Sequence, residues 1–254
     1  MSQGLRIDTQ GSVRVLTIDR PERANALDPA TREALARAVA EAGADASVGA
    51  LVVTGTGERA FCAGADIKAS LEAGGTLVPD PLQRSLYEIV LDCPKPVIAA
   101  VNGAAAGGGC ELAMACDLRV ADARASFVLP EAKRGMGAQF ALAMLPRLVP
   151  AGIAAEMLMT GDPIGAAEAK HWGLVNRIAP AGKCLEVAVE LAARIAANAP
   201  LSLRRAKAHL LKGQGLPLSA ALRLDEGPSP YTSEDRMEGF RAFAEKRPPR
   251  WKGR

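Results

Sequence analysis

Two short segments rich in small residues could each present backbone N–H groups to a ligand. Residues 62–68 read CAGADIK and residues 107–111 read GGGCE. Small residues let the main chain approach a ligand closely. Two converging N–H groups form an oxyanion hole, which stabilises the negative charge of an enolate. The second segment also predicts a loop that enters a helix, with its amides at the positive end of the helix dipole.

Two carboxylates follow the triple glycine, Glu111 and, twenty positions later (131 minus 111), Glu131. Such a pair beside an oxyanion hole could move the protons that an enolate mechanism requires. Each residue also has a plainer interpretation. Glu111 could be a helix N-terminal carboxylate favoured by the dipole, and Glu131 an ordinary surface glutamate. The sequence pattern alone leaves both alternatives open.

The composition is that of an ordinary globular protein, with 254 residues, 49% hydrophobic and 23% charged. Aromatic residues make up only 4%, which argues against a stacking platform for single-stranded nucleic acid. No run of about 18 apolar residues occurs, so we expect no membrane span. The net charge of +3 is concentrated in residues 245–254. This tail is either a solvated terminus or a binding element for anionic phosphates.

Cysteine and histidine usage argues against a metal centre. The five cysteines form no C-x-x-C pair, and residues 1–5 show no secretory leader. These features predict a reduced cytoplasmic protein whose thiols act as small hydrophobic groups. His171 and His209 lie far apart and are expected to be structural or exposed. A histidine-rich metal site and a Ser-His-Asp triad are therefore both poorly supported.

Hydrophobic periodicity predicts an α/β fold. A helix is expected over residues 31–44, begun by Asp28-Pro29. Strands are expected over residues 5–10, 13–18, 50–54, 96–101, 118–120 and 126–128. Strands interleaved with helices favour parallel pairing through crossovers.

The second half of the chain is predicted to be mainly helical. Helical spacing occurs over residues 141–148, 152–159, 166–172, 185–197, 201–212, 217–224 and 234–246, with one strand at 174–178. Ala199-Pro200 is the expected boundary between a core domain, residues 1–199, and a C-terminal helical lobe, residues 200–254, because a residue before proline avoids helix. Residues 74–80 are predicted to form a mobile surface loop.

Several ordered motifs resemble the enoyl-CoA hydratase/isomerase superfamily, the crotonases. They are DRPERANAL at 19–27, FCAGADIK at 61–68, KPVIAAVNG at 95–103, GGGCELA at 107–113, LPE at 129–131, TG at 160–161, GLVN at 173–176 and EKR at 245–247. The resemblance spans nearly the whole chain in the expected order. It implies a crotonase-like spiral of β-β-α units with a C-terminal helical region. It also implies a homotrimer or homohexamer whose C-terminal helices cover the active site.

The resemblance also assigns roles by position. Backbone N–H groups of Ala65 and Gly108 would form the oxyanion hole for the thioester oxygen of an acyl-CoA, and Glu111 and Glu131 would transfer protons. Residues that would contact coenzyme A are Arg23, Ala26, Ala63, Ala65, Asp66, Ile67, Lys68 and Gly108. Arg23 could equally be a solvated loop arginine, and Asp66 could pair with Lys68 or Arg59. Coenzyme A would be part of the substrate, so no separate cofactor is expected.

Within the superfamily, two glutamates favour addition of water to an enoyl-CoA, or its elimination from a 3-hydroxyacyl-CoA. An enoyl-CoA isomerase and a non-catalytic acyl-CoA-binding protein are the alternatives. Residues 135–141, GMGAQFA, depart from the family pattern, because Gln139 and Phe140 replace expected glycines and the run is one residue shorter. This change bears on the position of the water and on acyl length. Residues 129–133, 157–161, 171–177 and 244–254 look most like the carnitinyl-CoA dehydratase branch.

Overall fold

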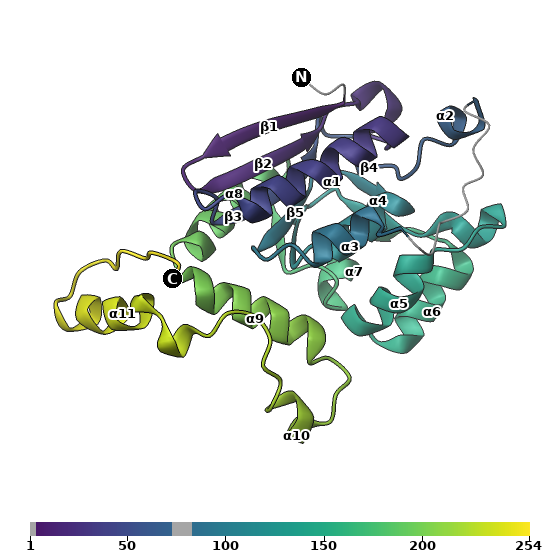
Figure 1. Cartoon of the computed structure of the whole chain (residues 1–254). Coiled ribbons are helices and arrows are strands. Elements are labelled where there is room, and N and C mark those ends of the chain that lie inside the picture. The colour runs from purple at the N-terminus through teal and green to yellow at the C-terminus, as the bar shows by residue number, and fades with distance from the viewer. Residues whose placement is uncertain (1–3, 73–82) are drawn as a thin grey trace.

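The computed structural model describes residues 4–72 and 83–254. Its larger sheet has six strands in the order β1-β2-β3-β5-β7-β10 (Figure 1). β1 and β2 form an antiparallel hairpin, and the other neighbours are parallel. The strands are β1 (Leu5–Gln10), β2 (Val13–Ile18), β3 (Ala50–Gly55), β5 (Val97–Val101), β7 (Leu118–Asp122) and β10 (Arg177–Ala179).

The central strands of this sheet are buried on both faces. In β3, Ala50 and Val52 pack into one hydrophobic cluster while Leu51 and Val53 pack into another. Side chains that alternate across a strand can serve two separate cores only if both faces are covered. The continuous apolar sequence of these strands follows from that double burial.

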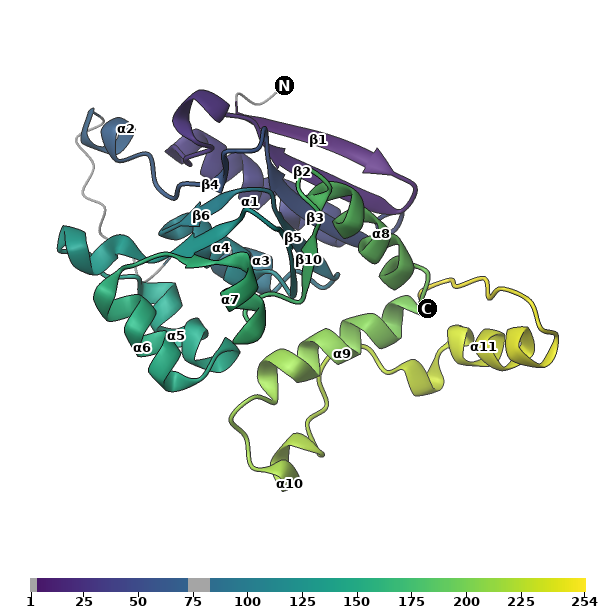
Figure 2. The same ribbon diagram turned by 180° about the vertical axis from the view of Figure 1, so that it is seen from behind.

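Helices cover the two faces of the sheet. α1 (Pro29–Ala44), α3 (Leu86–Leu91) and α4 (Gly108–Ala115) share the larger cluster, and α8 (Cys184–Ala196) contributes to the smaller one on the opposite face (Figure 2). Asp28 begins α1, because its carboxylate accepts a hydrogen bond from the Thr31 amide at 2.7 Å. This confirms the helix start expected at Asp28-Pro29.

A second sheet makes the fold a spiral. Its four strands run in the order β4-β6-β8-β9 and comprise β4 (Ala60–Cys62), β6 (Ala104–Ala106), β8 (Ser126–Val128) and β9 (Ile164–Gly165). β3, β5 and β7 are each followed by a short strand of this sheet and then by a helix. The fold is therefore the β-β-α spiral that the sequence resemblance implied. The functional segments lie at the ends of the short strands, directly after β4 and β6.

The chain from Pro200 onward is mainly helical. α9 (Pro200–Lys212), α10 (Leu218–Ala221) and α11 (Glu234–Ala244) extend away from the sheets (Figures 1 and 2). α9 begins at Pro200, where the boundary was expected; the division into domains 1–199 and 200–254 itself stays a prediction. Across residues 4–72 and 83–254, no helix is both long and apolar enough to cross a membrane.

Remaining helices surround the small sheet and the termini of the spiral. They are η1 (Pro21–Arg23), α2 (Ile67–Glu72), η2 (Pro130–Arg134), α5 (Gln139–Leu148), α6 (Ala151–Thr160), α7 (Ala166–His171) and η3 (Pro230–Thr232). α5 packs on both α4 and α6, and α6 packs on η2. Together α4, α5 and η2 position the two carboxylates singled out in the sequence.

Some sequence predictions were wrong in detail. The strand expected at 174–178 is β10, Arg177–Ala179, because only that part pairs with β7. Leu174 and Val175 are apolar because they are buried in the core, not because they lie in a strand. The strands of the small sheet before β8 and the helices α2 and α3 were missed, because they are short and their periodicity is weak. The loop expected at 74–80 lies outside the described residues.

A buried arginine fixes the C-terminal end of α4. Arg119 is 3% exposed, and its guanidinium donates to the carbonyls of Leu174 (2.6 Å), Ala113 (3.1 Å) and Cys116 (2.7 Å). A cation at this position also complements the negative end of the α4 dipole. Burial removes water from the Arg119 guanidinium and lowers its pKa. The three carbonyls accept hydrogen bonds in place of that water, which makes burial of the charge tolerable.

Replacing Arg119 by methionine should therefore destabilise the fold. The three carbonyls would lose their donor, and we expect the free energy of unfolding to fall by about 3 kcal/mol. Urea unfolding followed by circular dichroism measures the change. Arg37→Met, on the exposed face of α1, is the matched control and should shift the value by no more than about 0.5 kcal/mol. Equal effects for the two variants would contradict this role of Arg119.

Candidate active site

The two small-residue segments meet through their main chains. Gly64 and Gly107 adopt left-handed φ values of 89° and 51°, which glycine adopts without strain. A Cβ on Gly64 would lie 2.9 Å from the amide nitrogen of Gly108, and a Cβ on Gly108 would lie 3.8 Å from that of Ala65. The amide nitrogens of Ala65 and Gly108 therefore lie beside one another.

Neighbouring amides in both segments are already paired. The Asp66 amide donates to the Leu27 carbonyl at 3.0 Å, and the Gly107 amide donates to the Val128 carbonyl at 2.9 Å. Among the hydrogen bonds of residues 4–72 and 83–254, none is donated by the amides of Ala65 or Gly108. Both residues are partly exposed. These two N–H groups are thus available to a ligand oxygen.

Glu111 lies in the first turns of α4 and is buried, at 7% exposure. Its Oε1 accepts a hydrogen bond from the Ala141 amide at 3.0 Å. The N-cap residue of α5, Ala138, offers no side-chain acceptor, so Glu111 satisfies an amide of that helix from another element. Burial raises the pKa of Glu111, and hydrogen bonds from the Ala141 and Phe140 amides and the Tyr87 hydroxyl oppose the rise.

Glu131 lies in η2, and its carboxylate reaches Gly107. A Cβ on Gly107 would lie 2.8 Å from its Oε1, while Oε2 is buried with no hydrogen-bond partner in the described structure. Burial, and to a lesser degree the charge of Glu111, raise the pKa of Glu131. An unpartnered buried oxygen is costly to a fold, and such groups are frequent where a ligand will bind.

The segment after β4 is held by the chain around Ala24. The Ala63 amide donates to the Ala24 carbonyl at 3.1 Å, and the Leu27 amide donates to the Gly64 carbonyl at 2.7 Å. This short ladder brings Arg23 and Ala26 close to residues 63–68. Their contact with coenzyme A stays a prediction. Arg23 is exposed, Ala26 is buried, and Ile67 and Lys68 are exposed at the start of α2.

Arg20 joins these two segments. It forms ion pairs with Asp28 at 3.1 Å and with Asp66 at 3.2 Å, and donates to the Ala26 carbonyl at 2.5 Å. Asp66 was expected to pair with Lys68 or Arg59, but its ion pair with Arg20 spans a larger sequence distance that local patterns do not reveal. The pKa of Asp66 is lowered, mainly by the Ala69 amide and also by Arg20 and Arg23. Arg23 therefore lies near enough to Asp66 to act on its charge.

Tyr87 is a site residue that the sequence analysis missed. Its hydroxyl would be 2.5 Å from a Cβ on Gly108, and its ring lies 5.2 Å from that of Phe140. Burial and the Glu111 carboxylate raise its pKa. The available signal was the sequence SLYE at 85–88, in which Ser85 and Glu88 form a capping box that starts α3.

Several other polar and aromatic residues have structural surroundings. Asp117 accepts hydrogen bonds from the Val97 amide and the Lys207 side chain, which gives it a structural role. All five cysteines are buried and unpaired, as small hydrophobic groups would be. Burial raises the pKa of Cys62, which lies next to the site, to about 11. Trp251 donates to the Ala197 carbonyl at 2.8 Å, so it docks on its own chain.

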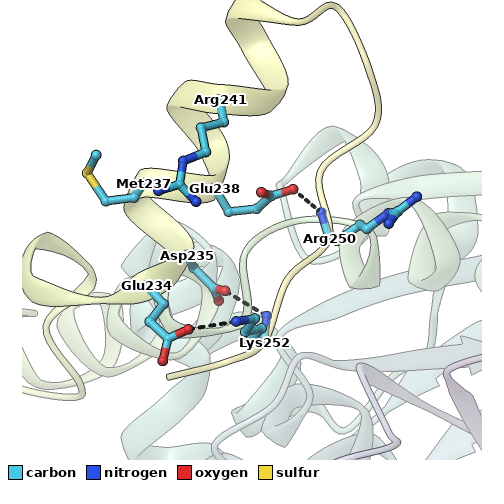
Figure 3. Close-up of a pocket in the computed structure, with 7 residues that line it drawn as sticks. All are labelled: Glu234, Asp235, Met237, Glu238, Arg241, Arg250 and Lys252. Carbon is cyan, nitrogen blue, oxygen red and sulfur yellow. Dashed lines mark hydrogen bonds and ion pairs between the residues drawn. The ribbon is translucent and has the colours of Figure 1, made fainter.

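A pocket of about 270 Å³ lies between α11 and the C-terminal tail (Figure 3). Asp235 accepts hydrogen bonds from the amides of Lys252 (2.6 Å) and Gly253 (2.9 Å), and Glu234 pairs with the Lys252 side chain. Glu238 likewise accepts from the Arg250 amide at 2.8 Å and pairs with Arg247. Most of the basic tail is therefore tied to acidic residues of α11. None of the predicted site residues lines this pocket.

The neighbouring amides of Ala65 and Gly108, the carboxylates of Glu111 and Glu131, and the β-β-α spiral together indicate one class of protein. The chain belongs to the enoyl-CoA hydratase/isomerase family, whose sequence model matches residues 8–254.

Particular relatives agree in fold and length. A carnitinyl-CoA dehydratase from Proteus mirabilis (strain HI4320) is 42% identical over 270 aligned residues, covering 100% of both chains. One from Salmonella typhi is 40% identical over 265, with the same coverage. Among solved structures, an enoyl-CoA hydratase from Mycobacterium tuberculosis H37Rv has a TM-score of 0.91 at 37% identity, covering 99% of each chain. One from Bacillus anthracis has a TM-score of 0.91 at 37% identity, covering 99% of this chain and 100% of that one.

The contact between the two main-chain segments can be tested at Gly64. Gly64→Ala combines a left-handed φ of 89° with contacts of 2.9 Å to the Ala106 carbonyl oxygen and the Gly108 nitrogen. We expect it to lower the free energy of unfolding by about 3 kcal/mol. Gly57→Ala is the matched control, because its φ of 82° is similar but nothing lies within 4 Å of the new methyl. Thermal unfolding should show the larger loss at Gly64; equal losses would mean that crowding plays no part.

Proposed function

We propose that this protein adds water to an enoyl-CoA thioester, or eliminates it from a 3-hydroxyacyl-CoA. The observation that supports the proposal best is the position of the amides of Ala65 and Gly108, which donate no hydrogen bond among the described residues. The carboxylate of the half-buried Glu131 lies against Gly107, and the buried Glu111 follows in the same helix as Gly108. When water adds to the β-carbon, the electron pair moves to the thioester oxygen. A prearranged donor at that oxygen contributes on the order of 3 kcal/mol to lowering the barrier.

The surroundings of the two carboxylates support different roles. Glu111 accepts hydrogen bonds from the α5 amides, which stabilise its ionised form. We assign it as the base that takes a proton from water. Among the described residues, Oε2 of Glu131 is buried without a hydrogen-bond partner, and burial and the charge of Glu111 raise the pKa of Glu131. We assign it as the acid that delivers the proton to the α-carbon.

Coenzyme A would lie along residues 23–26 and 63–68, the two segments that Arg20 links through Asp66 and the Ala26 carbonyl. In this proposal Arg23 and Lys68, both exposed, meet its phosphates, while Ala26, Ala63, Asp66 and Ile67 shape the channel. The small side chains at 63–65 leave room for the thioester. Coenzyme A enters and leaves as part of the substrate, so the reaction requires no resident cofactor.

Carnitinyl-CoA is the particular substrate to test first, because the relatives at 40–42% identity are carnitinyl-CoA dehydratases. The Tyr87–Phe140 ring pair supports this choice. Aromatic faces attract quaternary ammonium groups such as the one in a carnitinyl chain. A cytoplasmic location is proposed alongside, supported by five unpaired cysteines.

Hydration can be measured as loss of the absorbance of the conjugated thioester in crotonyl-CoA, with carnitinyl-CoA assayed in the reverse direction. Glu111→Gln and Glu131→Gln should each lower kcat by about 10²- to 10⁴-fold, because each removes one proton transfer. Affinity for the thioester should change little. No hydration or dehydration by the wild type, with activity on a 3-enoyl-CoA, would identify an isomerase. Thioester binding without any turnover would indicate a binding protein.

Unfolding measurements on Glu131→Gln show whether that variant is intact. A carboxyl whose pKa is raised in the folded state favours folding while protonated, and that contribution is lost as the pH rises through the raised pKa. Glutamine has no charge to bury. The variant should therefore be more stable than wild type at pH 8, with the difference disappearing at acidic pH below the ordinary value of 4.5.

We further propose a homotrimer, or a homohexamer built from two trimers, in which the C-terminal helices pack against neighbouring copies. On α11, Phe243 is 88% exposed and Phe240 is 58% exposed. Three leucines are exposed as well: Leu210 on α9, Leu218 on α10 and Leu222 directly after α10. Exposed large apolar side chains on helices outside the core are typical of surfaces that another protein covers. Figures 1 and 2 show these helices standing away from the sheets, where a second copy can reach them.

Light scattering after size-exclusion chromatography should give the mass of a trimer or hexamer. Phe243→Asp should shift the protein toward the monomer, because the interface would have to bury an unpaired charge. Glu33→Gln, on the exposed face of α1, is the control and should leave the mass unchanged. A monomeric wild type at micromolar concentration would contradict the assembly without affecting the proposed chemistry.

A further inference from the structure

A backbone bridge between two short segments sets the direction of the Ala65 amide. The Leu27 amide donates to the Gly64 carbonyl at 2.7 Å, and the Asp66 amide donates to the Leu27 carbonyl at 3.0 Å. Leu27 therefore bonds to the residues on both sides of Ala65. In such a parallel bridge, the N–H of the central residue points away from the partner strand. The bridge thus decides how Ala65 presents its N–H beside the Gly108 amide.

Arg20 contacts both strands of this bridge. Its Nη1 donates to the Ala26 carbonyl at 2.5 Å, and its Nη2 pairs with Asp28 at 3.1 Å. Ala26 and Asp28 are the residues on either side of the bridged leucine. Nη2 also pairs with Asp66, the residue that follows the amide donor, at 3.2 Å. One planar guanidinium therefore ties the two strands together.

The position of Arg20 is itself fixed by its surroundings. The side chains of Arg20 and Asp66 are 15% and 8% exposed, so salt screens their attraction little. The Arg20 amide donates to the Asn25 side chain at 3.1 Å, and the Asn25 amide donates to the Arg20 carbonyl at 2.9 Å. The Asn25 side chain in turn donates to the carbonyl of Ala60, the first residue of β4, at 2.7 Å. The arginine is thus anchored to the strand that leads into the site.

We propose that Arg20 is a positioning residue that aligns the Ala65 amide with the Gly108 amide. This inference rests on the proposed function for its catalytic part. Arg20 touches none of the reacting atoms in this role, and its effect on turnover passes through the bridge. An oxyanion donor stabilises the transition state only while it points at the oxygen, so a small displacement of the bridge is costly.

Arg20→Lys is the informative substitution, because it keeps the charge and removes the planar fork. One ammonium group cannot reproduce the set of contacts that the guanidinium makes with the carbonyl and the two carboxylates. We expect kcat for crotonyl-CoA to fall about tenfold. Affinity for butyryl-CoA, a thioester with no double bond to hydrate, should change less than about threefold, because the oxyanion contact is strongest in the transition state. Weaker binding with an unchanged kcat would overturn the positioning role.

A second half-buried arginine supplies the matched control. Arg14 lies on β2, is 21% exposed and pairs with Asp45 at 3.1 Å. Asp45 ends α1, whereas Asp28 begins it. Arg14→Lys should therefore leave kcat and butyryl-CoA affinity as they are in the wild type. An equal fall in kcat in both variants would mean that Arg20 has no special role at the site.

A double-mutant cycle tests whether Arg20 acts through Asp66. Asp66→Asn removes the charge, while its side-chain oxygen can still accept the Ala69 amide, which lies 3.2 Å from Asp66 Oδ1. The single variant should also lower kcat, and it tests the role if Arg20→Lys fails to fold. The double variant should lose no more than about twofold beyond Arg20→Lys, because both changes break the same contact. Losses that multiply would contradict coupling through this ion pair.

A measurement without turnover separates this inference from the proposed function. Infrared difference spectra of butyryl-CoA labelled with carbon-13 at the thioester carbon report the carbonyl stretch, which two N–H donors lower. The lowering should be smaller in Arg20→Lys than in the wild type. An equal lowering would overturn the inference even if the enzyme hydrates crotonyl-CoA. A smaller lowering in a protein that hydrates nothing would support the alignment and reject the function, whereas a wild type that binds no butyryl-CoA would overturn both.

Discussion

The close main-chain contact between the Gly64-Ala65 turn and the Gly107–Gly109 turn is the constraint on which the site depends. A Cβ on Gly109 would lie only 1.9 Å from the Cys62 carbonyl oxygen, so this approach is possible only between backbones. The short strands β4 and β6 pair beside it, and the Leu27–Gly64 hydrogen bond locks it from the other side. Two amides become neighbours because the sheet brings the turns together, not because either turn binds the other.

Two charged side chains near the opposite ends of α4, Arg119 and Glu131, have very different surroundings. Arg119 is surrounded by backbone carbonyls and strengthens the helix that carries Glu111. Glu131 keeps one buried oxygen without a partner. The hydrogen bonds of Arg119 stabilise the fold. The unpaired oxygen of Glu131 costs folding free energy, at a position where a bound substrate would supply the missing contact. A folded chain of marginal stability can hold such an oxygen only because groups such as Arg119 support it.

The sequence predicted most of the large sheet, because its strands are apolar runs bounded by glycine or proline, as at residues 50–54. Motif order predicted the spiral and the segments that meet at the site. Of the short strands, β8 was expected at residues 126–128, whereas β4, β6 and β9 were missed, because two or three residues carry too little periodicity to identify a strand reliably. Long-range contacts were equally hidden. The Arg20–Asp66 pair spans 46 residues, and the approach of Tyr87 to Gly108 depends on how α3 packs against α4. The roles of Ala65, Gly108, Glu111 and Glu131 came from the family resemblance, and the structure adds which of their polar atoms are paired.

The carboxylate of Glu111 accepts a hydrogen bond from the Ala141 peptide group in the first turn of α5, and a peptide N–H can donate whichever side chain its residue carries. A change of side chain at Gln139 or Ala141 therefore leaves the donor of this hydrogen bond in place. In the proposed mechanism, the side chains of this segment would border the acyl chain, while its peptide groups would hold the base. The acyl pocket could then change during evolution while the proposed reaction persists.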